Sequence, residues 1–114
     1  HTGDIGEIVG IQYLQKHGYH IRDTNFKFGR FGEIDIIAEK SGRVSFFEVK
    51  YRSHLGYGSP EEAIIPRKLQ KCLKTMQFYC KKNGIALTDI QFDVLAILKK
   101  SQSHQVTHYR NIAF

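Results

Sequence analysis

The chain has 114 residues, which is enough for one domain spanning 1–114 and too few for a dinucleotide-binding fold with a separate substrate domain. Lysine and arginine number 17 against 11 aspartates and glutamates, a formal net charge of +6. This balance predicts a polyanionic partner such as nucleic acid. A cationic surface that serves only solubility explains the same charge. No apolar run approaches the roughly 20 residues of a membrane-spanning helix, so we expect no membrane partner.

The hydrophobic periodicity predicts helices and strands in the order α-β-β-β-α-β-β. Apolar residues recur at helical spacing over 5–16, and Pro66 begins a second helical stripe that ends before Asn83-Gly84. A further helix start is expected at 59–62, where a proline follows a serine and precedes two acids. The expected strands cover 19–28, 33–39, 43–51, 89–98 and 105–112. Helices between strands of one sheet predict an α/β fold, a mixed sheet flanked by helices.

Both cysteines fall on the second long helix. Cys72 and Cys80 are eight residues apart, which separates them by about 12 Å along the helix axis. That distance is too long for a disulfide. Two thiols without a disulfide, in a sequence that shows no secretory signal, predict a reducing, cytoplasmic location.

Two acids and a lysine lie on neighbouring predicted strands. Glu48 and Lys50 share one face of their strand, because successive strand side chains alternate between faces. A two-residue turn at Ser41-Gly42 pairs positions whose numbers sum to 83 and puts Asp35 opposite Glu48. A three-residue turn would put Asp35 on the other face. The sequence therefore permits an Asp35–Glu48 site only with an even turn or a compensating bulge.

Opposed carboxylates repel each other and weaken a sheet unless a cation lies between them. Mg²⁺ or Mn²⁺ prefers such oxygen ligands, and the bound ion can activate water against a phosphodiester. Lys50 would orient that water or stabilise charge that builds on the phosphate. The alternative is a solvated sheet face, since a Glu-X-Lys pattern in a strand is a weak signal by itself.

Two motifs give the chain its resemblance to a known family. They are GEIDIIA at 32–38 and FFEVKYR at 46–52. With these motifs the chain resembles the bacterial YraN-like family of predicted endonucleases, which is placed in the PD-(D/E)XK nuclease superfamily near the Holliday junction resolvases. The supporting matches are Gly6-Glu7, Leu14, Gly18-Tyr19, Asn25, Gly58-Ser59-Pro60, Ala63, Lys68, Phe92-Asp93-Val94 and Asn111-Ile112-Ala113-Phe114. Among the departures, Gly10 replaces a usual alanine, and Gln91 replaces an arginine that would serve a phosphate contact or a structural ion pair.

The resemblance implies a restriction-endonuclease-like fold and metal-dependent hydrolysis of DNA, with branched or structured DNA as one substrate class. It implies that Asp35, Glu48 and Lys50 are catalytic, and that Asp35 and Glu48 hold Mg²⁺ or Mn²⁺, with the Val49 carbonyl as a further ligand. It matches Glu7 to a first-helix acid that supplements the catalytic metal site. The competing role for Glu7 is to stabilise the positive end of its helix. Resolvase-like enzymes cut two strands as dimers, so a homodimer is the assembly to test.

The strongest positive charge lies on the helix predicted over 66–82, with no acid between Glu62 and Asp89. We expect this helix to bind nucleic-acid phosphates, with a solvated helix face as the alternative. The residues expected to bind nucleic acid are Arg52, Lys68, Lys71 and Lys74.

Two rival functions remain open from the sequence. One is a nucleic-acid-binding protein that keeps a nuclease-like fold without efficient cleavage. The other is a partner-binding module with a vestigial site, against which the intact acids and lysine count.

Overall fold

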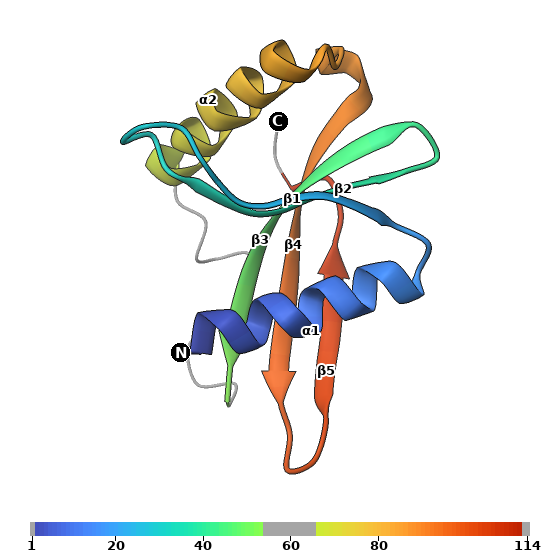
Figure 1. Cartoon of the computed structure of the whole chain (residues 1–114). Coiled ribbons are helices and arrows are strands. Elements are labelled where there is room, and N and C mark those ends of the chain that lie inside the picture. Colours follow the sequence, from blue (N-terminus) through green and yellow to red (C-terminus); the bar gives the residue numbers. More distant parts are fainter. Residues whose placement is uncertain (1, 54–65, 113–114) are drawn as a thin grey trace.

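The computed structural model describes residues 2–53 and 66–112 (Figure 1). Its strands form one sheet in the order β1-β2-β3-β4-β5, in which β3 and β4 are parallel and the other neighbours antiparallel. This mixed sheet with two helices confirms the predicted α-β-β-β-α-β-β fold. The helix start expected at 59–62 lies outside the described residues. The elements are α1 (Thr2–Lys16), β1 (His20–Lys27), β2 (Glu33–Lys40), β3 (Arg43–Arg52), α2 (Pro66–Asn83), the short 3-10 helix η2 (Leu87–Asp89), β4 (Ile90–Lys99) and β5 (His104–Tyr109).

The two helices pack on opposite faces of the sheet, because apolar side chains of the central strands alternate. Leu14 of α1 packs with Phe47 of β3, whereas Met76 of α2 packs with the adjacent Phe46. We call these two sides of the sheet the α1 face and the α2 face. Figure 1 shows α1 crossing β3, β4 and β5, and α2 at the end of the molecule away from the β4–β5 hairpin. Among the described helices, none has the length and apolar character to cross a membrane.

Two glycines let α1 approach the sheet closely. A Cβ on Gly10 would lie 3.2 Å from Cδ1 of Ile36 and 3.3 Å from Cδ1 of Leu95. A Cβ on Gly6, one turn earlier, would lie 3.2 Å from Cβ of Tyr51. These contacts are tight, so the glycine that replaces the usual alanine at position 10 fits the packing of this chain.

The β2–β3 turn has two residues, as the even-turn prediction requires. Ser41 (φ 53°) and Gly42 (φ 77°) both adopt left-handed backbone conformations, which are those of a tight hairpin whose twist matches its strands. Pairing runs from Lys40–Arg43 to Ile36–Phe47 without a shift. The pairing therefore follows the predicted register as far as Ile36–Phe47, one position before Asp35 and Glu48.

A buried polar network ties β4 and β5 to the segment after β5. Asp93 is fully buried and accepts hydrogen bonds from Nε2 of Gln91 (3.0 and 3.1 Å). It also accepts from Nε2 of His108 (2.7 Å) and from the backbone N–H of Asn111 (2.9 Å). Gln91, which replaces the usual arginine, thus takes part in a structural contact with Asp93.

We predict that Asp93→Ala lowers the free energy of unfolding by about 3 kcal/mol or more, because it leaves several buried donors without an acceptor. Urea unfolding followed by circular dichroism measures this change. The exposed Asp89→Ala serves as the control and should change stability by no more than about 0.5 kcal/mol. Equal effects of the two substitutions would contradict the network's importance.

Candidate functional site

Asp35 lies where β2 separates from β3. Strand pairing ends at Ile36–Phe47, and beyond it the backbone N–H of Val49 donates to Oδ2 of Asp35 at 2.7 Å. The Asp35 carboxylate thus accepts the hydrogen bond that a backbone carbonyl of β2 would otherwise accept. This bond holds Asp35 against β3. Burial of the side chain, followed by the charge of Glu48, raises the pKa of Asp35 to about 7.

Glu48 lies on the α2 face between two lysines. Its Oε1 is 3.0 Å from Nζ of Lys68, and its Oε2 is 3.7 Å from Nζ of Lys50. Burial and the neighbouring Lys68 lower the pKa of Lys50. Burial also acts to lower the pKa of Lys68, but the neighbouring Lys50 and the charge of Glu48 outweigh that effect and raise it.

The two acids match a small divalent cation in number and type. Within the described residues, no three His, Cys, Asp or Glu side chains gather where they could hold a metal. Asp35 and Glu48 are two carboxylates that could each supply an oxygen ligand. Mg²⁺ is commonly bound through one or two carboxylates, with water and substrate phosphates completing its shell. A cation on Glu48 would compete with Lys68 for a carboxylate oxygen.

Cys72 is a neighbour of the site, whereas the sequence analysis considered it only as a thiol without a disulfide partner. It lies on α2 one turn after Lys68 and is 5% exposed. Burial, with a further contribution from the Glu48 charge, raises the pKa of its thiol to about 11. The i, i+4 spacing puts Cys72 beside Lys68 on the helix surface. It does not predict that Cys72 lies near Glu48, because that depends on how α2 packs on the sheet.

Glu7 contacts a different strand. Both of its carboxylate oxygens accept hydrogen bonds from Nδ2 of Asn25, at 2.9 and 2.6 Å. Asn25 has a φ of 51° and falls opposite Asp35 in the β1–β2 register. Glu7 thus contacts the residue opposite Asp35 on the neighbouring strand. In the part of the chain that the structure describes, it forms no hydrogen bond or ion pair with Glu48, Lys50 or Lys68. Because α1 begins at Thr2, Glu7 also lies past the first turn, where the helix-end charge acts most strongly.

Stacked phenylalanine rings fix the β1–β2 turn against α2. The ring of Phe28 lies 4.2 Å from that of Phe78 and 5.2 Å from that of Phe31, centroid to centroid. Nζ of Lys74 lies 4.8 Å from the centroid of the Phe31 ring. The turn therefore lies along the helix that carries the predicted phosphate-binding lysines.

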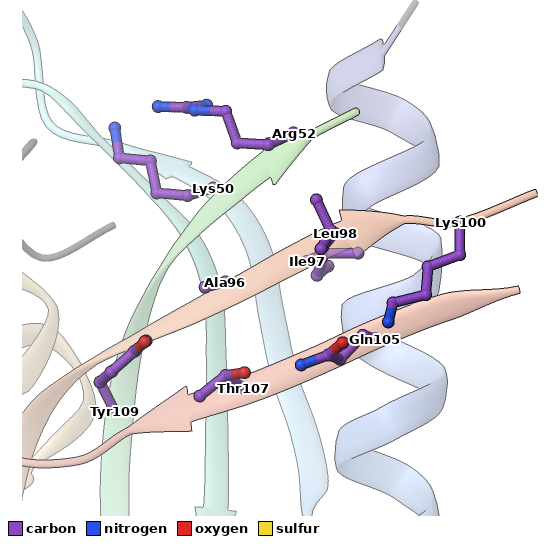
Figure 2. A pocket seen from close by; sticks show the side chains of 9 residues that line it. All are labelled: Lys50, Arg52, Ala96, Ile97, Leu98, Lys100, Gln105, Thr107 and Tyr109. Atoms are coloured by element: carbon purple, nitrogen blue, oxygen red, sulfur yellow. The ribbon is translucent and has the colours of Figure 1, made fainter. Parts of the chain in front are cut away.

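The four residues predicted to bind nucleic acid differ in their distance from the carboxylate pair, and one of them contacts it. Lys68 contacts Glu48 directly, and Lys71 lies beside Gly32, where an added Cβ would be 3.7 Å from Cβ of Lys71. Lys74 follows one turn later, and both Lys71 and Lys74 are exposed. Arg52 lies two residues after Lys50 on β3, and both side chains line a hollow (Figure 2).

Comparison with known proteins identifies the family. The model of a family described as "Uncharacterised protein family UPF0102" matches residues 6–97, so the chain belongs to this family. A UPF0102 protein of Persephonella marina is 42% identical over 102 residues, covering 90% of this chain and 87% of that protein. One from Flavobacterium psychrophilum is 37% identical over 109 residues, covering 96% and 90% of the two chains.

Membership of UPF0102 confirms the resemblance to the YraN-like family. The names of the relatives state the family and no activity. The chemistry must therefore be inferred from the residues of the site.

The raised pKa of Asp35 predicts a pH-dependent stability. In the folded protein this carboxyl keeps its proton up to about pH 7, whereas its ordinary pKa is 3.8. The stability that it contributes is present at low pH and is lost as the pH rises through 7. In metal-free buffer, wild type should therefore lose free energy of unfolding relative to Asp35→Asn between about pH 5 and pH 8.

Urea unfolding in EDTA at the two pH values measures this difference. The exposed Asp23→Asn is the control and should follow wild type. Parallel pH profiles for wild type and Asp35→Asn would show that Asp35 is not held beside a buried charge.

Proposed function

We propose that this member of UPF0102 is a divalent-metal-dependent endonuclease that hydrolyses phosphodiester bonds of DNA at Asp35, Glu48 and Lys50. The observation that carries the proposal is the carboxylate pair, in which a partly buried Asp35 lies close enough to Glu48 for the charge of Glu48 to raise the pKa of Asp35. Such a pair is unfavourable without a cation. The lysines beside it supply positive charge where a phosphate would approach.

Each residue has a role that follows from its chemistry. Asp35 and Glu48 would supply oxygen ligands, with the Val49 carbonyl as the nearby backbone oxygen. The bound Mg²⁺ or Mn²⁺ would polarise the phosphodiester and acidify a water molecule. Lys50 lies 3.7 Å from Glu48 and has a lowered pKa, which suits a group that orients the attacking water and takes part in its proton transfer.

The charge of the chain supports a nucleic-acid substrate. Lys68 contacts Glu48, and Lys71 and Lys74 follow it along α2. Each of the three can contact a phosphate. Branched or structured DNA and a homodimer follow from likeness to the resolvases alone. A cytoplasmic setting suits Cys72 and Cys80, which are buried, free thiols.

One observation favours a second function, nucleic-acid binding without efficient cleavage. Nζ of Lys68 lies 3.0 Å from Oε1 of Glu48, so an ion pair already satisfies that carboxylate. In a binding protein this ion pair would persist, and the lysines would serve only the phosphates.

Substitution of Lys50 separates catalysis from binding. We predict that Lys50→Ala slows single-turnover cleavage about 100-fold or more, because a group that acts on the transition state is lost. DNA affinity should fall by no more than roughly tenfold, because one cation among several is removed. The assay uses Mg²⁺ or Mn²⁺ and single-stranded, duplex, flap and four-way DNA, with the exposed Lys99→Ala as the control.

The results distinguish the two candidate functions. If wild type binds these DNAs but cuts none of them with either metal, the binding protein is the correct description. If Lys50→Ala cuts at the wild-type rate, Lys50 is not catalytic.

Charge reversal on α2 tests the nucleic-acid interface separately. The double variant Lys71→Glu/Lys74→Glu should weaken binding to all sequences alike and flatten its salt dependence, by roughly one unit of log–log slope for each phosphate that the variant no longer neutralises. Fluorescence anisotropy over a range of salt concentrations measures both effects. The control is Lys16→Glu/Lys99→Glu, which makes the same change of charge elsewhere; an equal fall in affinity would mean that only net charge matters.

A further inference from the structure

A hollow of about 250 Å³ lies across β3, β4 and β5 and shares Lys50 with the candidate site (Figure 2). Glu48, Lys50 and Arg52 alternate onto the α2 face of β3, so the hollow opens on the same face as the carboxylate pair. α2 lies at the other end of the molecule from the β4–β5 hairpin. The hollow therefore extends the candidate site toward that hairpin.

The strand register builds the hollow from two rows with the same chemical order. Each row crosses the three strands with a cation on β3, an apolar side chain on β4 and a polar side chain on β5. The rows are Lys50–Ala96–Thr107 and Arg52–Leu98–Gln105. Rows two residues apart are about 7 Å apart along the strands, a spacing comparable to that between neighbouring phosphates of an extended nucleic-acid strand.

The lining favours an anion. Lys50, Arg52 and Lys100 contribute three cations, and no acid is among the lining residues that the structure describes. Among the described residues, the side chains of Thr107 and Tyr109 form no hydrogen bond, so their hydroxyls are available to a ligand. Phosphate oxygens accept bonds from all of these groups.

The hollow is small, so it suits a small group or one unit of a longer chain. Pockets for drug-sized ligands measure about 300–1,000 Å³, and this one is smaller. Ala96 and Leu98 form an apolar floor between the cations of β3 and the polar side chains of β5. Such a floor suits the face of a sugar whose flanking phosphates lie at the charged rim.

We propose that this hollow binds the sugar–phosphate backbone of a nucleic-acid strand next to the bond that is cut. Phosphates lie on Lys50, Arg52 and Lys100, and a sugar lies over Ala96 and Leu98. The strand then runs from the carboxylate pair toward the β4–β5 hairpin. This inference rests on the proposed function, because it takes the scissile phosphate to lie at Asp35 and Glu48.

Adjacent lysines at the hairpin provide a matched test. Lys100 lines the hollow, whereas Lys99 is the last residue of β4, is exposed and does not line it. We expect Lys100→Glu to weaken binding of a fluorescein-labelled DNA oligonucleotide in EDTA by roughly tenfold and to lower the salt slope by about one. Lys99→Glu, with the same change of charge, should weaken binding less than about twofold.

A second pair of variants tests whether the Lys100 substitution acts only by disturbing the fold of the β4–β5 hairpin. Gln105→Glu puts an acid into the hollow and should weaken binding, but less than Lys100→Glu, because it changes the charge by one unit rather than two. Gln102→Glu makes the same change at an exposed position between β4 and β5, outside the lining, and should leave the affinity close to that of wild type.

The outcomes separate this proposal from the endonuclease proposal. Equal affinities for the Lys99 and Lys100 variants overturn the strand-binding role of the hollow, even if wild type cleaves DNA with metal. The predicted difference, found in a protein that cleaves nothing with either metal, supports DNA binding in the hollow and overturns the endonuclease. No DNA binding by wild type overturns both.

Discussion

The pairing of β2 with β3 is the constraint on which the rest of the molecule depends. The Ser41-Gly42 turn fixes a register that runs unshifted to Ile36–Phe47. A slip of one residue would exchange every side chain between the faces. Phe46 and Phe47 would then leave their separate cores, and Asp35 would leave Glu48. The interactions that hold the two helices on the sheet are therefore the ones that bring the acids together.

Hydrogen-bond donors and lysines beside Asp35 and Glu48 offset part of the repulsion between these two carboxylates. Asp35 accepts a hydrogen bond from the backbone N–H of Val49. Each carboxylate oxygen of Glu48 lies near a lysine ammonium group. Burial makes these charge interactions stronger than they would be in water. These contacts offset part of the repulsion between the two carboxylates, and they leave both in a setting where a cation or a phosphate can replace an ion pair.

Local sequence patterns predicted the elements and the register, but contacts between distant elements were beyond them. Alternation in β3 put Glu48 and Lys50 on one face, and the even turn brought Asp35 to them. The ion pair of Glu48 with Lys68 depends on how α2 lies across the sheet, which helical periodicity does not specify. The bond between Glu7 and Asn25 depends in the same way on the position of α1 and on a left-handed residue inside β1, which no period-two pattern indicates.

The central claim is that Asp35 and Glu48 hold a divalent cation. Anomalous diffraction from crystals soaked in Mn²⁺ tests it most directly, with Glu48→Gln crystals treated in the same way. We expect one anomalous peak between the two carboxylates in wild type, with Lys68 turned away from Glu48, and no peak there in the variant. A wild-type map with no peak at this position under saturating Mn²⁺, and with the ion pair of Lys68 and Glu48 intact, would contradict the claim.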